Sequence, residues 1–186
     1  MKIYLTAIVC FVLFVNCFGQ TGNQQQKKDD LNSCILSSNL DDYKDSLIQN
    51  PKIMKIILDD NDSCVIQLLD EIKFNIYQNK NSVEYYDLLE SISKISDGYI
   101  SDLLVDISFD LFNNDYKRFS TFLHDHKEAR LSQFLIEAWS LRVSEANDEK
   151  EELNGIKQAV MDNSSNSEIK NYLLHLHGKI NPAIWD

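Results

Sequence analysis

Four histidines are the residues whose spacing most directly suggests metal chemistry. They occur as two His-x-His pairs, at residues 124–126 and 175–177. Imidazole nitrogens are common ligands of zinc and copper. Both pairs fall in segments with helical periodicity, however, where residues two apart point about 200° away from each other. Neither pair can chelate a metal alone, so a metal site would need His126 to meet His175 or His177 across packed helices.

A structural interpretation of the histidines is simpler. Each pair lies where its predicted helix ends, and a cationic imidazole complements the dipole at a helix C-terminus. The chain also shows no Ser-His-Asp or Cys-His set with a local signature, and its five glycines form no phosphate-binding loop. We therefore expect no cofactor and no resident metal, and the sequence favours a protein that is not an enzyme. The alternative is a metal- or carboxylate-dependent hydrolase that uses these histidines with nearby acids.

Three aspartates form the most regular charged pattern of the chain. Asp102, Asp106 and Asp110 are spaced i, i+4 and i+8, so they line one stripe of a predicted helix. The structural interpretation is a solvated stripe, because unpaired acids are seldom buried. The functional interpretation is a surface that receives lysine or arginine from a partner. Glu137 and Arg142, on the next long helical segment, would extend this binding surface.

The N-terminal residues predict export from the cytoplasm. Lys2 precedes an almost uninterrupted apolar stretch that suits a signal peptide and is short for a membrane span. Cleavage after Gly19 would remove residues 1–19. A second interpretation is a lipoprotein signal, in which Cys17 is lipidated and becomes the first residue of the mature chain. A third is an uncleaved anchor, which the short apolar length disfavours.

Two cysteines remain after such a leader is removed. Cys34 and Cys64 would meet an oxidising compartment, where a disulfide is the common outcome. The bridge would close a loop of about 30 residues and stabilise the fold by roughly 3–4 kcal/mol. The other interpretation is two small apolar side chains that pack separately.

Beyond the leader the chain is organised as one helical domain. Residues 20–30 are polar and predict a flexible linker, and residues 31–186 show apolar residues at helical spacing almost throughout. Ser96-Asp97-Gly98 and Asn113-Asn114 predict breaks. The segment between them is apolar on two sides, so we expect residues 98–112 near the middle of the domain.

The predicted fold class is all-α. About eight or nine helices joined by short loops should pack as antiparallel neighbours. Helix pairs recur every 30–37 residues or so, a period near that of helical repeats, but no residue-level repeat accompanies it. The sequence therefore leaves two architectures open, an irregular α-solenoid of HEAT or armadillo type and an irregular helical bundle.

Net charge narrows the choice of partners. The formal charge is −11, which repels nucleic-acid phosphates. The sequence therefore predicts a periplasmic or secreted binding protein whose acidic surface takes a basic protein partner. One specific form is an immunity-type protein of the cell envelope that neutralises a toxin. Membrane contact would come only through a lipid anchor at Cys17.

Overall fold

The computed structural model describes residues 40–50, 52, 55, 62–78 and 83–184. The expectations for the leader, Cys17, the linker at residues 20–30 and Cys34 concern positions outside these ranges, and they stay predictions.

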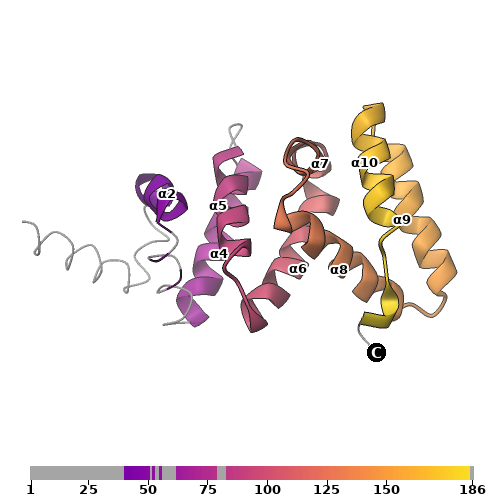
Figure 1. Ribbon diagram of the computed structural model, residues 1–186, viewed down its shortest axis with the longest axis horizontal. Helices are drawn as coiled ribbons and strands as arrows, with labels where there is room; N and C mark the ends of the chain where they lie inside the picture. Colours follow the sequence, from indigo (N-terminus) through magenta and orange to yellow (C-terminus); the bar gives the residue numbers. More distant parts are fainter. Residues whose placement is uncertain (1–39, 51, 53–54, 56–61, 79–82, 185–186) are drawn as a thin grey trace, which may run out of the picture.

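The described residues are helical throughout their regular structure and contain no strand, which confirms the all-α prediction. No described helix combines the length and the hydropathy that crossing a membrane requires. The helices, labelled in Figure 1, are α2 (Leu40–Gln49), α4 (Asp62–Gln78), α5 (Val83–Ser93), α6 (Gly98–Asn114), α7 (Tyr116–Asp125), α8 (Arg130–Ser144), α9 (Glu149–Asn163), α10 (Ser167–His177) and the 3-10 helix η2 (Pro182–Ile184).

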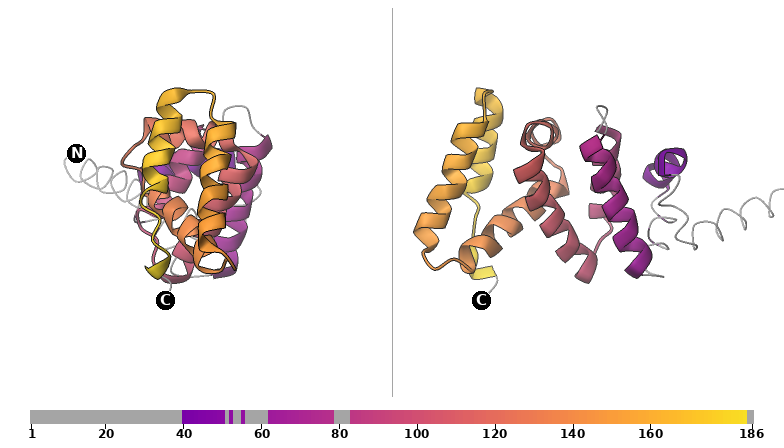
Figure 2. Two further views of the ribbon diagram at one scale, coloured as in Figure 1. Left: turned by 90° about the vertical axis from the view of Figure 1, so that its right-hand side faces the viewer. Right: turned by 180° about the vertical axis from the view of Figure 1, so that it is seen from behind.

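The helices form three successive groups along the long axis of the molecule, and η2 returns to pack on α8. Figure 1 shows α2, α4 and α5 at one end, α6, α7 and α8 in the middle, and α9 and α10 at the other end. The view from behind in Figure 2 shows the same sequence of layers.

The most enclosed helix is α8. The sequence placed residues 98–112 at the centre, and α6 does pack against α7 and α8. However, α8 packs against α5, α6, α9, α10 and η2, and nine of its 15 residues are buried, against seven of 17 in α6. Trp139 of α8 is fully buried, and the ring of Phe112 meets it edge-on at 5.1 Å. The apolar residues on both sides of α8 allow this, because each side has a neighbouring helix to cover it.

The two breaks beside α6 have different causes. Gly98 adopts φ +47°, a conformation that glycine tolerates best, directly after the extended Asp97. The second break falls one residue later than the predicted turn at Asn113-Asn114. Asp115 ends α6 and precedes α7, and its carboxylate accepts hydrogen bonds from the Tyr86 hydroxyl and from Nε of Arg118 at 2.7 Å.

Tyrosine hydroxyls join helices along the whole array. In each case the tyrosine hydroxyl of one helix forms a hydrogen bond with a side-chain oxygen of a second helix, or of a residue that directly flanks that second helix. Buried hydroxyls need such partners, and each partner fixes how the two helices are placed. The pairs are Tyr85 with Asp41, Tyr77 with Asp110, Tyr86 with Asp115, Tyr116 with Ser164, and Tyr172 with Ser132.

Candidate functional site

The three aspartates of the predicted stripe do not share one environment. Asp102 and Asp106 are exposed on α6, whereas Asp110 is half-buried. The Asp110 carboxylate accepts a hydrogen bond from the Tyr77 hydroxyl at 2.8 Å and lies 3.4 Å from Nζ of Lys73. Asp110 therefore holds α4 against α6, and the exposed part of the stripe is Asp102 and Asp106.

The contact between Tyr77 and Asp110 defines one side of both helices. Residues three, four, seven, eight and eleven positions before a given residue share its side of a helix. Six of the positions counted back in this way from Tyr77 and Asp110 stand apart from the buried Leu69 and Ile107 and the half-buried Lys73 and Leu103: they are Phe74, Asp70 and Ile66 on α4, and Asp106, Asp102 and Tyr99 on α6. All six residues are exposed. We call these six residues the α4–α6 face.

This face combines large apolar side chains with carboxylates. Phe74 is 55% exposed and Tyr99 is 50% exposed, which is unusual for aromatic residues. Within the described part of the chain, no ion pair involves Asp70, Asp102 or Asp106. Their charges are therefore available to groups outside the molecule.

The structure connects Arg142 to α6 but gives Glu137 a different neighbour. The Arg142 guanidinium lies 5.2 Å from the ring centre of Phe109 and 3.6 Å from a carboxylate oxygen of Glu152. Glu137 accepts a hydrogen bond from Gln133 at 3.0 Å on its own helix. No hydrogen bond or ion pair in the described ranges joins Glu137 to α6, so sequence spacing alone placed it beside the stripe.

The histidines lie at helix ends, as their periodicity indicates. His124, His175 and His177 are in last turns, and His126 directly follows α7. Nδ1 of His126 lies 3.0 Å from the carbonyl oxygen of Phe122, and Nε2 of His177 lies 2.9 Å from that of Leu153. Among the described residues, no three histidine, cysteine or acidic side chains are grouped so that they could hold a metal ion.

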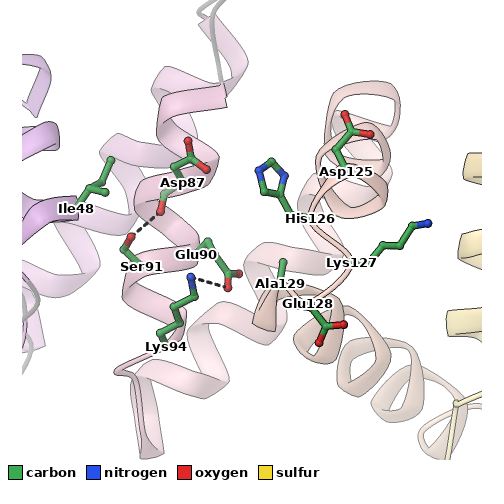
Figure 3. A pocket seen from close by; sticks show the side chains of 10 residues that line it. All are labelled: Ile48, Asp87, Glu90, Ser91, Lys94, Asp125, His126, Lys127, Glu128 and Ala129. Carbon is green, nitrogen blue, oxygen red and sulfur yellow. Dashed lines mark hydrogen bonds and ion pairs between the residues drawn. The ribbon is translucent and has the colours of Figure 1, made fainter.

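One histidine does face a carboxylate across a pocket. A cavity of about 470 Å³ lies between α5 and the turn from α7 to α8. Figure 3 shows Asp87 on the α5 side and the His126 ring on the opposite side, directed towards each other. Burial raises the pKa of Asp87, and the nearby positive charge of His126 acts in the opposite direction. The sequence carried no signal for Asp87, because a single acid in an amphipathic helix looks like any solvated residue.

The floor of this pocket contains a buried carboxylate with a structural task. Glu90 is 6% exposed and accepts hydrogen bonds from the backbone N–H groups of Arg130, at 2.9 Å, and Leu131, at 3.1 Å. Those groups begin α8, where Ala129 occupies the N-cap position and offers no side-chain acceptor. Nζ of Lys94 lies 3.6 Å from the same carboxylate. Glu90 of α5 thus caps α8 from another helix.

The chemistry available in the pocket is limited to binding and proton transfer. Asp87 and His126 could exchange a proton with a small ligand. The Ser91 hydroxyl donates to the backbone carbonyl of Asp87 at 2.8 Å, so it is not activated as a nucleophile. His126 lines this pocket, whereas His175 lines a different cavity together with Glu128, so these two histidines of the hydrolase alternative belong to separate pockets.

Cys64 is buried at the start of α4 and takes part in a disulfide bond. The other three cysteines are outside the described ranges. The pairing with Cys34 therefore stays a prediction.

Comparison with known proteins adds no family to this description: no protein-family model, no curated protein and no solved structure matches the chain significantly.

Proposed function

We propose that this protein is an exported, non-enzymatic binding protein that holds a basic protein partner on its α4–α6 face. The observation that carries the proposal is the composition of that face. Phe74 and Tyr99 are exposed on the same two helices as Asp70, Asp102 and Asp106, three exposed carboxylates without an ion pair in the described chain. Exposed aromatic residues in an acidic surround are what a protein interface needs for affinity and for partner selection.

The two kinds of residue would act at different stages of binding. The net charge of −11 and the carboxylates of the face attract a basic partner and raise the association rate. Phe74 and Tyr99 then become buried against apolar groups of the partner, which slows dissociation. Asp110 keeps α4 and α6 in place through Tyr77 and Lys73, so the face is formed before the partner arrives.

The arrangement of the helices supports a repeat-like architecture. The row of helices along one axis in Figure 1 fits an irregular α-solenoid better than a closed bundle, because in the described chain the main contacts of α9 and α10 beyond their own pair are with α7 and α8. Such rows present long side surfaces to protein partners. The predicted leader, with a lipid anchor at Cys17 as its variant, supports a periplasmic or secreted protein. An immunity-type protein that neutralises a basic toxin is one form of this function.

The test compares charge reversals on and off the face. The substitutions Asp102→Lys and Asp106→Lys are combined in one variant, and Glu149→Lys and Glu151→Lys, on exposed positions of α9, are combined in its control. Each protein is immobilised and exposed to envelope extract of the source cell at low and at high salt. We expect the wild type and the control to retain the same protein at low salt, and the face variant to lose it.

High salt should release the partner. The range of the attraction between exposed charges is about 10 Å at 0.1 M salt, and it becomes shorter as the salt concentration rises. Replacement of Phe74 with Ser should also reduce retention while leaving the charge unchanged. Equal retention by the face variant and the α9 control would refute the proposed surface.

A further inference from the structure

A second pocket lies on the other side of the turn between α7 and α8. It has a volume of about 520 Å³ and is lined by that turn, the first turns of α8 and the end of α10. Lys127, Arg130 and Lys179 line it, together with His175, and Glu128 is the only acid among its lining residues in the described chain. We call this cavity the α8–α10 pocket. Its charge is opposite to that of the molecule as a whole.

The neighbouring pocket of Figure 3 shows that this charge is not a general property of the turn. There the lining residues include four acids, among them Asp87, Glu90 and Asp125, against Lys94 and Lys127. Three permanently cationic residues and one acid line the α8–α10 pocket, and the guanidinium of one of them, Arg130, lies 3.4 Å from the carbonyl oxygen of Lys94. The charged residues that line two adjoining cavities of the same molecule therefore differ in net sign.

Two hydroxyl groups add hydrogen-bonding capacity to the α8–α10 pocket. Oγ of Ser132 lies 2.9 Å from the Tyr172 hydroxyl, and Ser132 is only 6% exposed. One proton serves the bond between the two hydroxyls. The Tyr172 hydroxyl donates its own proton to the carbonyl oxygen of Lys127 over 3.5 Å, a long hydrogen bond that a closer ligand oxygen would replace. Burial raises the pKa of Tyr172, which keeps this donor protonated at neutral pH.

The first backbone N–H groups of α8 do not contribute to ligand binding. Glu90 already accepts hydrogen bonds from the N–H groups of Arg130 and Leu131. Recognition must therefore come from the side chains, and these are donors and cations. An anion is the ligand class that accepts from all of them.

We propose that the α8–α10 pocket binds a small organic phosphate monoester. The pocket has a surplus of two positive charges, because Lys127, Arg130 and Lys179 outnumber the single acid Glu128. This surplus matches the dianion that a phosphate monoester carries above a pH of about 6. Ile136 and Leu176 also line the cavity and offer apolar contact to the organic group. This site is independent of the α4–α6 face.

Isothermal titration calorimetry in a phosphate-free buffer tests the proposal with two probes, inorganic phosphate and phenyl phosphate. The pocket variant combines Arg130→Gln with Lys179→Gln. The control combines Lys117→Gln with Lys157→Gln, which removes the same charge from exposed lysines on α7 and α9 outside this pocket. Melting of the helical circular dichroism signal shows that each variant is folded.

We expect the wild type and the control to bind phenyl phosphate more tightly than inorganic phosphate. The pocket variant should bind both at least about tenfold more weakly, because each lost cation removes a charge-assisted hydrogen bond. Absence of phenyl phosphate binding to the wild type would overturn the proposal, and so would an equal loss of affinity in the control, which would indicate non-specific attraction to lysines. Inorganic phosphate that binds as tightly as phenyl phosphate would overturn the assignment to an organic monoester.

Discussion

Glu90 shows how one buried carboxylate can join two helices whose contacting residues are 40 positions apart. It supplies the acceptor that Ala129 lacks, and it is compensated by the backbone N–H groups and by Lys94. The Asp87 and His126 side chains meet in the same pocket because this contact sets the distance between α5 and the turn from α7 to α8.

Replacing Glu90 with Ala should lower the free energy of unfolding by about 2–3 kcal/mol, because two buried N–H groups lose their acceptor. Glu90→Gln keeps one acceptor oxygen and should cost about 1 kcal/mol. Urea unfolding measures both values. The control is Glu137→Ala, since Glu137 bonds only to the exposed Gln133 among its described neighbours, and its effect should stay below about 0.5 kcal/mol. Similar losses for Glu90→Ala and Glu137→Ala would contradict the capping role.

At the scale of elements, α6 and α8 are held by apolar packing, while η2 is attached through a polar contact. Ser140 of α8 is fully buried, donates to the carbonyl oxygen of Ile136 and accepts from the backbone N–H of Asn181, just before η2. Ser108 of α6 is equally buried, yet its hydroxyl has no hydrogen-bond partner among the described residues. Two serines of equal burial thus have opposite energetic roles.

The matched substitutions Ser108→Ala and Ser140→Ala separate these roles. Ser108→Ala should leave the free energy of unfolding unchanged or raise it by up to about 1 kcal/mol, since it removes a buried hydroxyl that is not hydrogen-bonded. Ser140→Ala should lower it by about 1–2 kcal/mol, because the Asn181 N–H loses its acceptor. Thermal and urea unfolding give both values. A loss of stability in Ser108→Ala as large as that in Ser140→Ala would show that Ser108 has a partner after all.

At the scale of the whole molecule, two regions of opposite local charge lie on different helices. The acidic α4–α6 face belongs to the half that holds α4 and α6, and the basic α8–α10 pocket belongs to the half that holds α8 and α10. Tyrosine hydroxyls join the layers between them. Burial and hydrogen bonding to Asp41 raise the pKa of Tyr85 to about 12, and burial together with an aspartate partner raises the pKa of Tyr77 and Tyr86 as well.

These shifts predict how the protein unfolds in alkali. A phenol whose pKa is higher in the folded than in the unfolded state stabilises the fold below the unfolded value of about 10, and that stability is lost as the pH rises through the folded value. The fold should therefore fail cooperatively above pH 10, and the linking tyrosines should ionise in that same step. Tyrosinate absorbance and circular dichroism, recorded together against pH, measure this. Tyr86→Phe should reduce the absorbance change of the step. Complete tyrosine ionisation with the helices intact would contradict the prediction.

Local pattern was enough to predict the helical class of the chain. The periodicity of apolar residues, the break at Ser96-Asp97-Gly98 and the histidines at helix ends depend on contacts within a few residues, and the described structure confirms them. The candidate stripe was predicted in part for the same reason. Asp102 and Asp106 are on one exposed side because helical geometry alone puts them there.

The partners of these helices were decided only by the tertiary structure. Asp110 binds Tyr77 and Glu90 caps α8 through hydrogen bonds between residues that are 33 and 41 positions apart in the chain. Asp87 and His126, which face each other across a pocket, are also far apart in the sequence. The basic pocket likewise joins the start of α8 to the end of α10. Periodicity shows which side of a helix is apolar, but it carries no information about which neighbour covers that side. That choice depends on side-chain packing between helices. For this reason Asp110 holds two helices together, whereas Asp102 and Asp106, at equivalent positions of the same helix, stay exposed.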